Sequence, residues 1–488
     1  MTTVAVIGAY GSAGSAVAET LAPAEEIDDL VLIDDGDPGG GLCILEGCMP
    51  SKEVLSAAAH RYRARHDDRL DGTPSVDLDA VVARKDDHTL GWAEHRRDAI
   101  HGLAERDDVR FLDERARFVD DTTIAVGGEP GRGGEAGSGE RIDADHVVIA
   151  TGSTVNVPDL PGLDEVDYHT SSDVLDATAF PDTAVVMGFG TVGLELVPYI
   201  SEVGGTDVAV VEHDAAPIDH GDPAFGEAAL DIYRDQFGVD VVTHAYEERV
   251  EATGDGGTRL HLDRDAASTG GDGPLVDGDV VEADELFLFT GRRPAIDGLG
   301  LEHTAIEPGP GWVEDTMASR DVEDVYVVGD ANGKEPILHV AKEQGYHAAE
   351  NVLRDLRGES RTEYEHLHHR IVFSGLATYP FVCLGMTEAD AAASDREYVA
   401  VTREAASDGV FKTKDAPEGL ATLVVDADDG TVLGYQGLHL HADVMAKTMQ
   451  VVLENGMTVY DVPDRAYHPT TPEIVDGLLR DAKDALAD

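Results

Sequence analysis

TAVVMGFGTVGLELVPYISEVGGTDVAVVEHD, residues 183–214, contains a complete strand-turn-helix-strand unit. An apolar strand leads into an unbroken G-x-G-x-x-G at Gly188, Gly190 and Gly193, and a helix then leads to a second strand that ends at Glu212. Glycines in such a turn let backbone amides and the helix N-terminus approach a pyrophosphate, while the acid can accept hydrogen bonds from a ribose. The stretch therefore predicts a dinucleotide-binding unit.

A second unit of this kind opens the chain. TVAVIGAYGSAGSAVAETLA, residues 3–22, is a strand, a glycine turn and a helix of small residues, and LVLIDD, residues 30–35, is the next strand. The glycines are spaced G-x-x-G-x-x-G, as if Tyr10 had been inserted, so this turn alone is equally compatible with a plain tight turn. Its candidate ligands are Gly8, Gly11, Ser12, Gly14 and Asp34. Two such units predict an α/β protein that binds two dinucleotides.

Three later stretches are apolar strands that end in glycine. DHVVIATGSTVNVP, residues 145–158, and DELFLFTGRRPAID, residues 284–297, each end in Thr-Gly and suit crossings between two nucleotide domains. DVYVVGDANG, residues 324–333, places a carboxylate at a strand's C-terminal end, where it can meet a ligand hydroxyl. Any one of them alone is an ordinary strand end. The candidate residues here are Thr151, Gly152, Gly291, Gly329 and Asp330.

Two of the three cysteines lie together in GGGLCILEGCMPSKEVL, residues 39–55. We expect Cys43 and Cys48 on the first turns of a helix, where the sulfurs can reach one another and where the helix N-terminus and Lys52 lower a thiol pKa. This environment favours a reversible disulfide, because the thiolate is the attacking species. The alternatives are a pair of small buried hydrophobic residues and a zinc site, which lacks further ligands because His60 is alone.

The pattern changes from about residue 362. Strands such as RIVFSG (370–375) and LATLVV (420–425) mix with the helices DVMAKTMQVVLENG (443–456) and PEIVDGLLRDAKDAL (472–486) and predict an α+β domain. Two glycine-rich stretches, residues 127–141 and 265–279, are interpreted as loops of appended β-meanders or as insertions without a role.

The order of these motifs resembles the flavin-dependent pyridine nucleotide disulfide oxidoreductases, the family of glutathione reductase, dihydrolipoamide dehydrogenase and mercuric reductase. The resemblance runs through GCMPSK, ATGS, GFGTVGLE, TGRRP, VVGDANG and HPTTPE and so covers nearly the whole chain. It implies two Rossmann-like domains and a homodimer. The implied parts are an FAD-binding domain at 1–155, an NAD(P)-binding domain at 156–283, a return segment at 284–358 and a dimerisation domain at 359–488.

The resemblance also implies an electron relay from NAD(P)H through FAD to a Cys43–Cys48 disulfide and then to a substrate disulfide. Asp34 is expected on the adenosine ribose of FAD and Asp330 on its ribityl chain. The implied catalytic roles are a charge-transfer thiolate, an interchange thiol, a cation near the flavin with its carboxylate partner, and an acid with the carboxylate that orients it: Cys48, Cys43, Lys52, Glu195, His468 and Glu473. The last two are expected to act in the other subunit's site.

Two histidine clusters are candidates for metal ligation. They are HLHHR, with His366, His368 and His369, and HLHAD, with His439 and His441. Alternation of this kind is typical of a half-exposed strand, and we predict no metal site.

Composition limits the partners. The chain has 488 residues, 97 Asp and Glu against 36 Lys and Arg, and a formal net charge of −61. Such a field repels nucleic acid and anionic membranes. Because the acids are spread through periodic segments, we interpret them as a surface suited to concentrated salt. No stretch approaches the roughly 18 apolar residues of a membrane span, and MTTVAVIG shows no targeting signal, so we expect a cytoplasmic protein.

The substrate is narrowed by what the motifs lack. The tail RDAKDALAD has no cysteine pair, which argues against a mercuric reductase. Leu42 and Tyr10 depart from the motifs of dihydrolipoamide dehydrogenases. A salt-adapted cytoplasm implies a haloarchaeal host, so we prefer a reductase of bis-γ-glutamylcystine or a similar small disulfide. A dihydrolipoamide dehydrogenase, a mercuric reductase-like enzyme and a non-enzymatic flavoprotein remain alternatives.

The sequence is compatible with either NADH or NADPH as the nicotinamide coenzyme. Glu212 suits the free 2'-hydroxyl of NADH and repels a 2'-phosphate, whereas His213 could help to hold a phosphate. Both residues are candidate ligands of the second dinucleotide.

The composition generates a first prediction. The protein should lose stability as KCl is lowered from molar to dilute concentrations, because the Debye length then grows beyond about 3 Å and the acids repel one another. Thermal melting across a KCl series measures this effect. An unfolding temperature that stays the same between dilute and molar KCl would contradict the salt-adapted interpretation.

Overall fold

The computed structural model of the protein describes residues 1–128, 139–254, 256–465 and 467–487, in two compact units. Unit 1 comprises Met1–Pro50, Arg84–Asn156 and Arg292–His366, and unit 2 comprises Ser51–Ala83, Val157–Gly291 and Leu367–Asp488. The domain boundaries expected at 155, 283 and 358 remain a prediction, and most of the predicted loop at 127–141 lies outside the described residues. No helix among the described residues has the length and apolar character needed to cross a membrane.

The centre of unit 1 is a five-stranded parallel sheet in the order β19-β7-β1-β2-β3. Its strands are β1 (Thr3–Ile7), β2 (Asp29–Asp34), β3 (Val109–Asp113), β7 (His146–Ile149) and β19 (Val325–Val327). All five side chains of β1 are buried, as expected for a strand covered on both faces. Alternate residues face opposite layers, with Val4 and Val6 in one apolar core and Ala5 and Ile7 in another.

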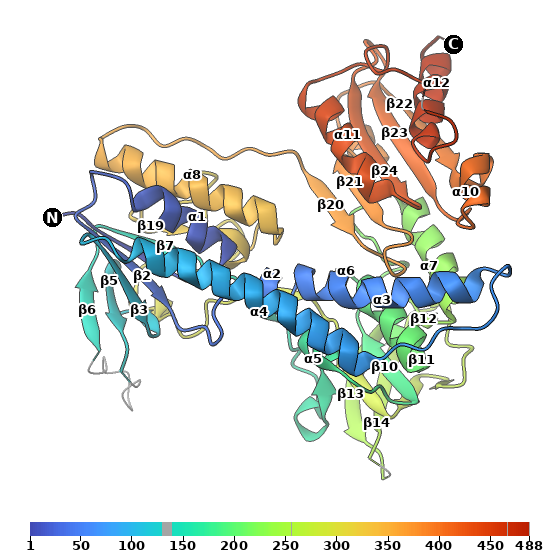
Figure 1. Cartoon of the computed structure of the whole chain (residues 1–488), viewed down its shortest axis with the longest axis horizontal. Coiled ribbons are helices and arrows are strands. Elements are labelled where there is room, and N and C mark those ends of the chain that lie inside the picture. The colour runs from blue at the N-terminus through green and yellow to red at the C-terminus, as the bar shows by residue number, and fades with distance from the viewer. Residues whose placement is uncertain (129–138, 255, 466, 488) are drawn as a thin grey trace. The chain divides into compact units, whose positions relative to one another are not determined.

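Two helices cover one face of this sheet. Helices α1 (Ser12–Leu21) and α8 (Leu338–Leu356) lie side by side there (Figure 1). Their close approach needs Gly345, because a Cβ at that position would lie 2.4 Å from the Ala13 carbonyl oxygen. The other face packs against an antiparallel meander of β4 (Ala116–Phe118), β5 (Thr123–Val126) and β6 (Glu140–Asp143). This meander was expected from the sequence.

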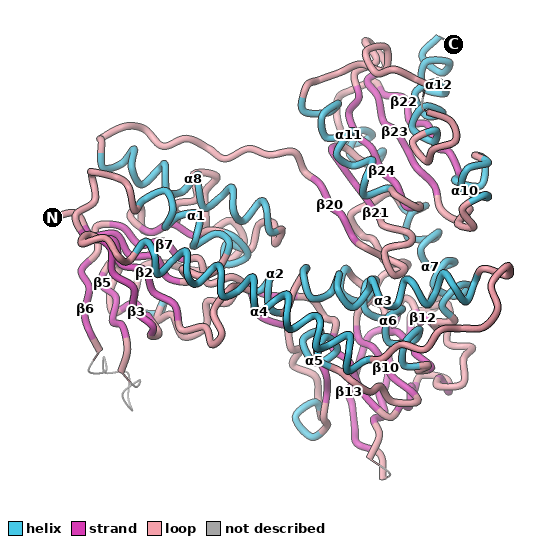
Figure 2. The backbone as a smooth tube through the Cα atoms, viewed as in Figure 1, coloured by secondary structure: helices cyan, strands magenta, loops and turns pink. Residues whose placement is uncertain are grey.

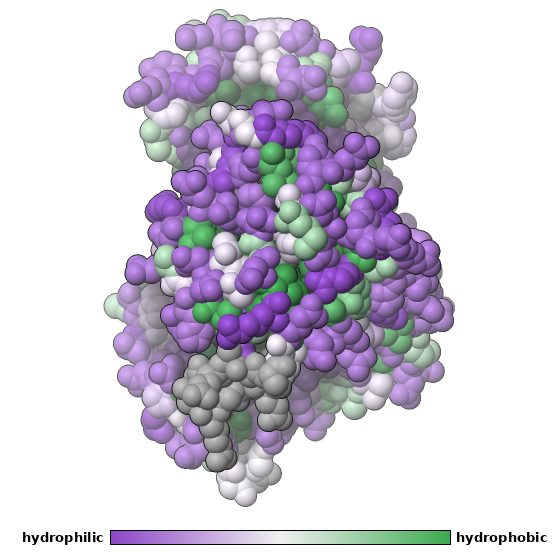
Figure 3. All heavy atoms as spheres, turned by 90° about the vertical axis from the view of Figure 1, so that its left-hand side faces the viewer, coloured by the Kyte–Doolittle hydropathy of each residue, from purple (hydrophilic) through white to green (hydrophobic). Residues whose placement is uncertain are grey.

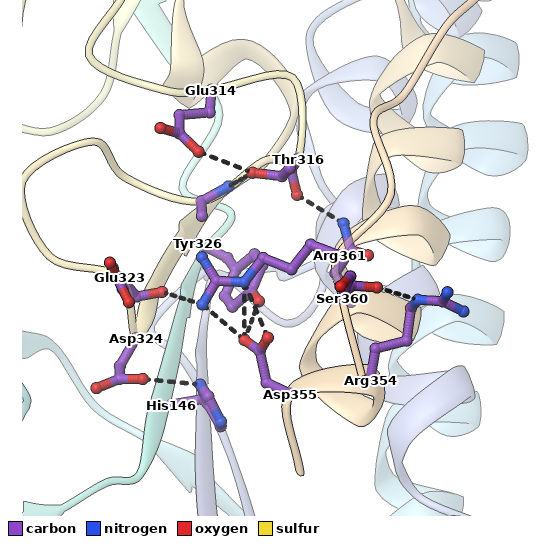
Figure 4. A network of polar contacts seen from close by, with 12 residues as sticks. His146, Glu314, Thr316, Glu323, Asp324, Tyr326, Arg354, Asp355, Ser360 and Arg361 are labelled. Atoms are coloured by element: carbon purple, nitrogen blue, oxygen red, sulfur yellow. Dashed lines mark hydrogen bonds and ion pairs between the residues drawn. The ribbon is translucent and has the colours of Figure 1, made fainter. Parts of the chain in front are cut away.

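A polar network holds the segment after α8 against the sheet (Figure 4). The Arg361 guanidinium donates to the Asp355 carboxylate at 2.7–2.9 Å, and the Tyr326 hydroxyl donates to the same carboxylate at 2.5 Å. Although burial acts to raise the pKa of Asp355, these hydrogen bonds hold it below its ordinary value. His146 lies beside Asp324 at the same sheet edge, and burial lowers the pKa of this imidazole.

Unit 2 repeats the plan of a parallel sheet flanked by helices. Its parallel sheet has the order β12-β11-β10-β17-β9, built from β9 (Tyr168–His169), β10 (Thr183–Met187), β11 (Asp207–Val211), β12 (Asp240–Val242) and β17 (Glu285–Leu288). Its helices are α5 (Ser171–Asp176), α6 (Thr191–Tyr199) with the π-helix η2 (Ile200–Gly204), and α7 (Pro223–Phe237). An antiparallel sheet is formed by β13 (Ala245–Ala252), β14 (Thr258–Arg264), β15 (Val276–Asp277) and β16 (Val280–Ala283).

The C-terminal part of unit 2 is an antiparallel sheet in the order β20-β21-β24-β23-β22 with helices packed on it (Figure 2). The strands are β20 (His369–Val372), β21 (Phe381–Gly385), β22 (Tyr398–Glu404), β23 (Leu420–Asp426) and β24 (Val432–Leu438). The helices are α9 (Glu388–Ala393), α10 (Gly409–Thr413), α11 (Ala442–Glu454) and α12 (Glu473–Ala487). The α/β fold class with two Rossmann-like units and an α+β C-terminal domain is confirmed.

The surface agrees with the acidic composition. Figure 3 shows one face of the molecule, on which hydrophilic residues predominate and hydrophobic ones are scattered. Small groups of apolar residues among polar ones are common on protein surfaces.

Candidate active site

The two glycine turns share one backbone plan. Gly8 and Gly188 follow β1 and β10, and each has a φ of +93°. A Cβ on Gly14 would lie 2.0 Å from the Gly8 carbonyl oxygen, and one on Gly193 would lie 2.8 Å from that of Gly188. Only glycine therefore lets each helix start so close to the strand that precedes it.

The first turn is one residue longer than the second, as the sequence predicts. One residue, Phe189, precedes Gly190, which caps α6. Two residues, Ala9 and Tyr10, precede Gly11, which caps α1. The insertion therefore lies ahead of the helix cap and leaves the helix N-terminus itself intact.

An acid lies beside each turn. The Asp34 carboxylate at the end of β2 accepts from the Tyr10 amide at 2.9 Å, and the Glu212 carboxylate after β11 accepts from the Phe189 amide at 2.9 Å. Each acid also accepts from the amide two residues further on. Burial raises the pKa of both carboxyls. The donor in both units is thus the residue just before the helix cap, which fixes the acid where a ribose hydroxyl can reach it.

His213 is surrounded by acids. Its Nε2 lies 2.6 Å from a Glu247 carboxylate oxygen, and its ring stacks on Tyr246 with centroids 4.8 Å apart. The hydrogen bond to Glu247 raises the pKa of the imidazole. Glu212 and Asp214, which flank His213 in the chain, add two further carboxylates near its ring.

The crossing segments of unit 1 meet in a small antiparallel pair, β8 (Ser153–Val155) and β18 (Arg292–Pro294). The Ser153 hydroxyl donates to Asp330 at 2.7 Å and accepts from Arg292 Nε at 3.0 Å. Asp330 lies on the short 3-10 helix η4 (Gly329–Asn332). Sequence reasoning missed Ser153 and Arg292, although both stand in the quoted motifs ATGS and TGRRP.

Backbone conformation explains the remaining glycines of these segments. Gly152, Gly291 and Gly329 have φ values of +73°, +85° and +67°. The Thr151 hydroxyl is buried and has no hydrogen-bond partner among the described residues. A buried hydroxyl in need of a partner, next to the first glycine turn, fits a bound FAD.

The two redox cysteines lie on different helices. Cys43 is on the short α2 (Leu42–Leu45) and Cys48 opens α3 (Cys48–His66), so the expectation that both stand on one helix is wrong. Gly47 permits the break, because a Cβ there would lie 3.0 Å from the Cys43 Cα atom. The two Sγ atoms are 2.7 Å apart, close enough to join with little movement.

Lys52 and Glu195 are brought together within unit 2. Lys52 Nζ on α3 lies 2.7 Å from both carboxylate oxygens of Glu195 on α6. This carboxylate also accepts from the Ser51 hydroxyl and the Phe373 amide, and the Phe373 ring lies 4.5 Å from Lys52 Nζ. The Glu195 side chain is 9% exposed and the Lys52 side chain 31% exposed, so a fixed cation remains partly accessible.

His468 and Glu473 also lie together. His468 Nδ1 is 3.1 Å from both carboxylate oxygens of Glu473, which begins α12. The Thr470 amide and His468 together lower the pKa of this carboxyl. The His468 side chain is 82% exposed in the single chain and leaves its Nε2 open to a partner.

The two histidine clusters differ in exposure: His366, His368 and His369 are partly or fully exposed, whereas His439 of the second cluster is buried. His366 pairs with Glu335 at 2.6 Å. Strand β24 ends at Leu438, and the next residue, His439, is fully buried between the Tyr435 hydroxyl and the Leu440 carbonyl. Burial lowers the pKa of His439 to about 4. The expectation of partial exposure is therefore wrong for His439, whose surroundings are those of a core residue.

Known protein families match nearly the whole chain. The family described as pyridine nucleotide-disulphide oxidoreductase matches residues 2–345, and its dimerisation domain matches residues 372–478. A dihydrolipoyl dehydrogenase of Haloferax volcanii is 30% identical over 96% of this chain and 94% of its own. A mercuric reductase of Bacillus cereus is 27% identical over 94% of this chain and 67% of its own.

Solved structures match the fold. LpdA from Mycobacterium tuberculosis aligns with a TM-score of 0.79 at 21% identity and covers 99% of each chain. The HOCl-induced flavoprotein disulfide reductase RclA from Escherichia coli aligns with a TM-score of 0.78 at 22% identity over 98% of this chain and 99% of its own. At these identities the likeness supports the architecture alone.

The glycine geometry generates a second prediction. Gly193→Ala should lower the free energy of unfolding by about 1–3 kcal/mol, because the new methyl meets backbone that cannot move away. Gly190→Ala is the matched control, since nothing lies within 4 Å of its Cβ position. Both variants should weaken nicotinamide nucleotide binding, because the Gly190 methyl would enter the open space that faces the expected pyrophosphate and the Gly193 methyl would displace the helix N-terminus. Denaturant unfolding without nucleotide and a binding titration separate the two effects. Unchanged nucleotide affinity in Gly190→Ala would contradict the placement.

Proposed function

Because the chain belongs to the pyridine nucleotide-disulphide oxidoreductases, which are FAD-dependent enzymes that use NAD(P)H, we propose that it reduces a low-molecular-weight thiol disulfide through Cys43 and Cys48. The preferred substrate in this proposal is bis-γ-glutamylcystine. The observation that carries it is the 2.7 Å distance between the sulfur of Cys43, on α2, and that of Cys48, at the start of α3. The matched dimerisation domain supports a homodimer.

Each glycine turn and the acids beside it have a cofactor-binding role in this proposal. The first glycine turn and Asp34 would hold the adenosine diphosphate part of FAD, and Asp330 would hold its ribityl chain. The second turn and Glu212 would hold the nicotinamide nucleotide. FAD, when bound, carries an electron pair from the nicotinamide to the disulfide. The Lys52 cation, which Glu195 holds in place, would stabilise negative charge on the flavin of bound FAD.

The exchange itself needs only thiols and a proton donor. The Cys43 thiolate attacks one sulfur of the substrate disulfide, so that a mixed disulfide forms and the first substrate thiolate leaves. Cys48 then attacks Cys43, releases the second thiolate and closes the Cys43–Cys48 disulfide. His468 of the partner subunit would protonate the leaving thiolates, with its imidazole held through Nδ1 by a carboxylate of its own subunit.

The third cysteine does not extend this relay. Cys383 lies buried on β21, and burial raises the pKa of its thiol to about 12. A high pKa makes it a poor nucleophile at neutral pH. Among the described residues no thiol pair besides Cys43 and Cys48 is present to hand over a metal ion, which disfavours mercury reduction.

The choice of bis-γ-glutamylcystine has two further supports. The acidic composition suits a salt-rich cytoplasm, and relatives from Haloferax volcanii and Halobacterium salinarum agree with such an environment. Three cysteines in a chain of 488 residues are also too few for a secreted disulfide framework, so we propose a cytoplasmic location. Dihydrolipoamide oxidation is the second candidate, because the Haloferax relative bears that name.

A substrate panel tests the proposal. Purified enzyme in high salt should oxidise NADH or NADPH with the highest kcat/KM for bis-γ-glutamylcystine, measured against cystine, lipoamide and Hg(II). Cys43→Ser should abolish disulfide reduction and keep electron transfer to ferricyanide, which needs no thiol. Cys383→Ser is the matched control and should keep both activities. Rapid turnover with lipoamide alone would overturn the preference.

The surroundings of His213 favour NADH over NADPH. Three carboxylates, Glu212, Asp214 and Glu247, stand near one imidazole, so a 2'-phosphate would meet net negative charge. We predict a higher kcat/KM for NADH. Glu212→Gln should reduce the ratio of kcat/KM for NADH to kcat/KM for NADPH, because it removes a negative charge and keeps the side-chain volume. Asp207→Asn, at the opposite end of β11, is the control. A wild-type enzyme that prefers NADPH would refute this assignment.

A further inference from the structure

The inserted Tyr10 anchors the first glycine turn to helix α4 (Leu78–Leu103) and strand β3. Its side chain is 4% exposed, its ring lies 5.1 Å from that of Phe111, and its hydroxyl lies 2.7 Å from His101 Nε2. Gly39 passes directly over the ring, since a Cβ there would lie 2.1 Å from it. The insertion is therefore a packed part of the turn.

The backbone of Tyr10 has two further partners. Its amide donates to Asp34, the acid expected on a ribose. Its carbonyl accepts from Arg96 Nη1, on α4, at 3.2 Å. Tyr10 thus contacts Asp34 through its amide, the Arg96 guanidinium through its carbonyl, and helix α4 through its hydroxyl.

Arg96 lies beside the N-terminus of α1. Its Nη1 is 3.4 Å from the hydroxyls of both Ser12 and Ser15, which lie in the first turns of that helix. These partners are neutral oxygens, and within the described ranges Arg96 forms no ion pair and its Nε and Nη2 make no hydrogen bond. A partly exposed cation in a chain of net charge −61 is thus left without a carboxylate.

The first turn of α1 supplies no other charge, since it contains no acidic residue and the helix contains no basic one. A helix N-terminus already attracts anions through its unpaired amides. A guanidinium adds a full charge and a fork that matches phosphate oxygens. The turn, the Ser12 hydroxyl and Arg96 together make a stronger anion site than the turn alone.

We propose that Arg96 binds the diphosphate of FAD and that the Tyr10 insertion positions it there, an inference that rests on the proposed flavoenzyme function. Without the extra residue, the carbonyl that holds Arg96 and the ring that joins the turn to α4 would both be missing. The insertion therefore lengthens the glycine turn by one residue and holds the positively charged Arg96 beside it.

FAD retention tests this assignment. Arg96→Gln should release FAD about 30-fold faster on dilution of the holoenzyme, as expected for the loss of a charge-assisted hydrogen bond, and free flavin fluorescence measures the release. Arg96→Lys keeps the positive charge but lacks the forked guanidinium, so its rate of FAD release should lie between those of the wild type and Arg96→Gln. Arg106→Gln is the control, because Arg106 pairs with Asp108 on the surface.

A second variant separates phosphate binding from packing. Tyr10→Phe removes the hydroxyl bond to His101 and keeps Arg96, so it should lower the unfolding temperature and leave FAD release within about twofold. The phosphorus NMR signals of bound FAD should shift in Arg96→Gln and stay unchanged in Tyr10→Phe.

Two outcomes would overturn the inference. One is FAD release in Arg96→Gln at the wild-type rate. The other is a rate of FAD release in Arg96→Gln and Tyr10→Phe that rises only in proportion to the fall in their unfolding temperatures, while the phosphorus NMR signals of bound FAD stay unshifted. A colourless wild-type protein would instead refute the proposed function itself, so the two failures are distinguishable.

Discussion

Both nucleotide turns depend on a helix that starts in contact with the carbonyl group of the glycine that directly follows the preceding strand, Gly8 or Gly188. A Cβ on Gly14 or Gly193 would lie 2.0 or 2.8 Å from that carbonyl oxygen, so only glycine allows the approach. The contact fixes the helix N-terminus, and the amide just ahead of the helix cap fixes the neighbouring acid, Asp34 or Glu212. The expected anion site and ribose acceptor therefore share one backbone constraint in each unit.

This constraint is also why the fold could be predicted from the sequence. The glycine spacing and the fully apolar strands are local signals, so both units, the meanders and the α+β segment were expected. Local signals failed where tertiary packing decides. Gly47 interrupts the helix and places Cys43 on a separate one, and a buried position next to Tyr435 overrides the alternation around His439. The burial of His439 leaves no mark in the residue pattern, whereas Gly47 is visible in the sequence and indicates the break only once the structure is known.

The contacts of the candidate site are mostly long-range. Lys52 and Glu195 are 143 residues apart, and Ser153 and Arg292 are 139 apart. The first pair was expected only because the chain resembles a known family, and the second was missed. Arg96, 86 residues from Tyr10, carries no local signal at all. In a chain with 36 basic and 97 acidic residues, a cation without a carboxylate partner is informative once the fold is known.

The central claim is that two neighbouring sulfurs exchange electrons with a flavin. Anaerobic dithionite titration of the coloured enzyme tests it most directly, because the flavin and the cysteine pair each take up two electrons. We predict an uptake of four electrons per subunit, with a long-wavelength thiolate-to-flavin band at the midpoint that is absent in Cys48→Ser. Uptake of only two electrons without that band would contradict it.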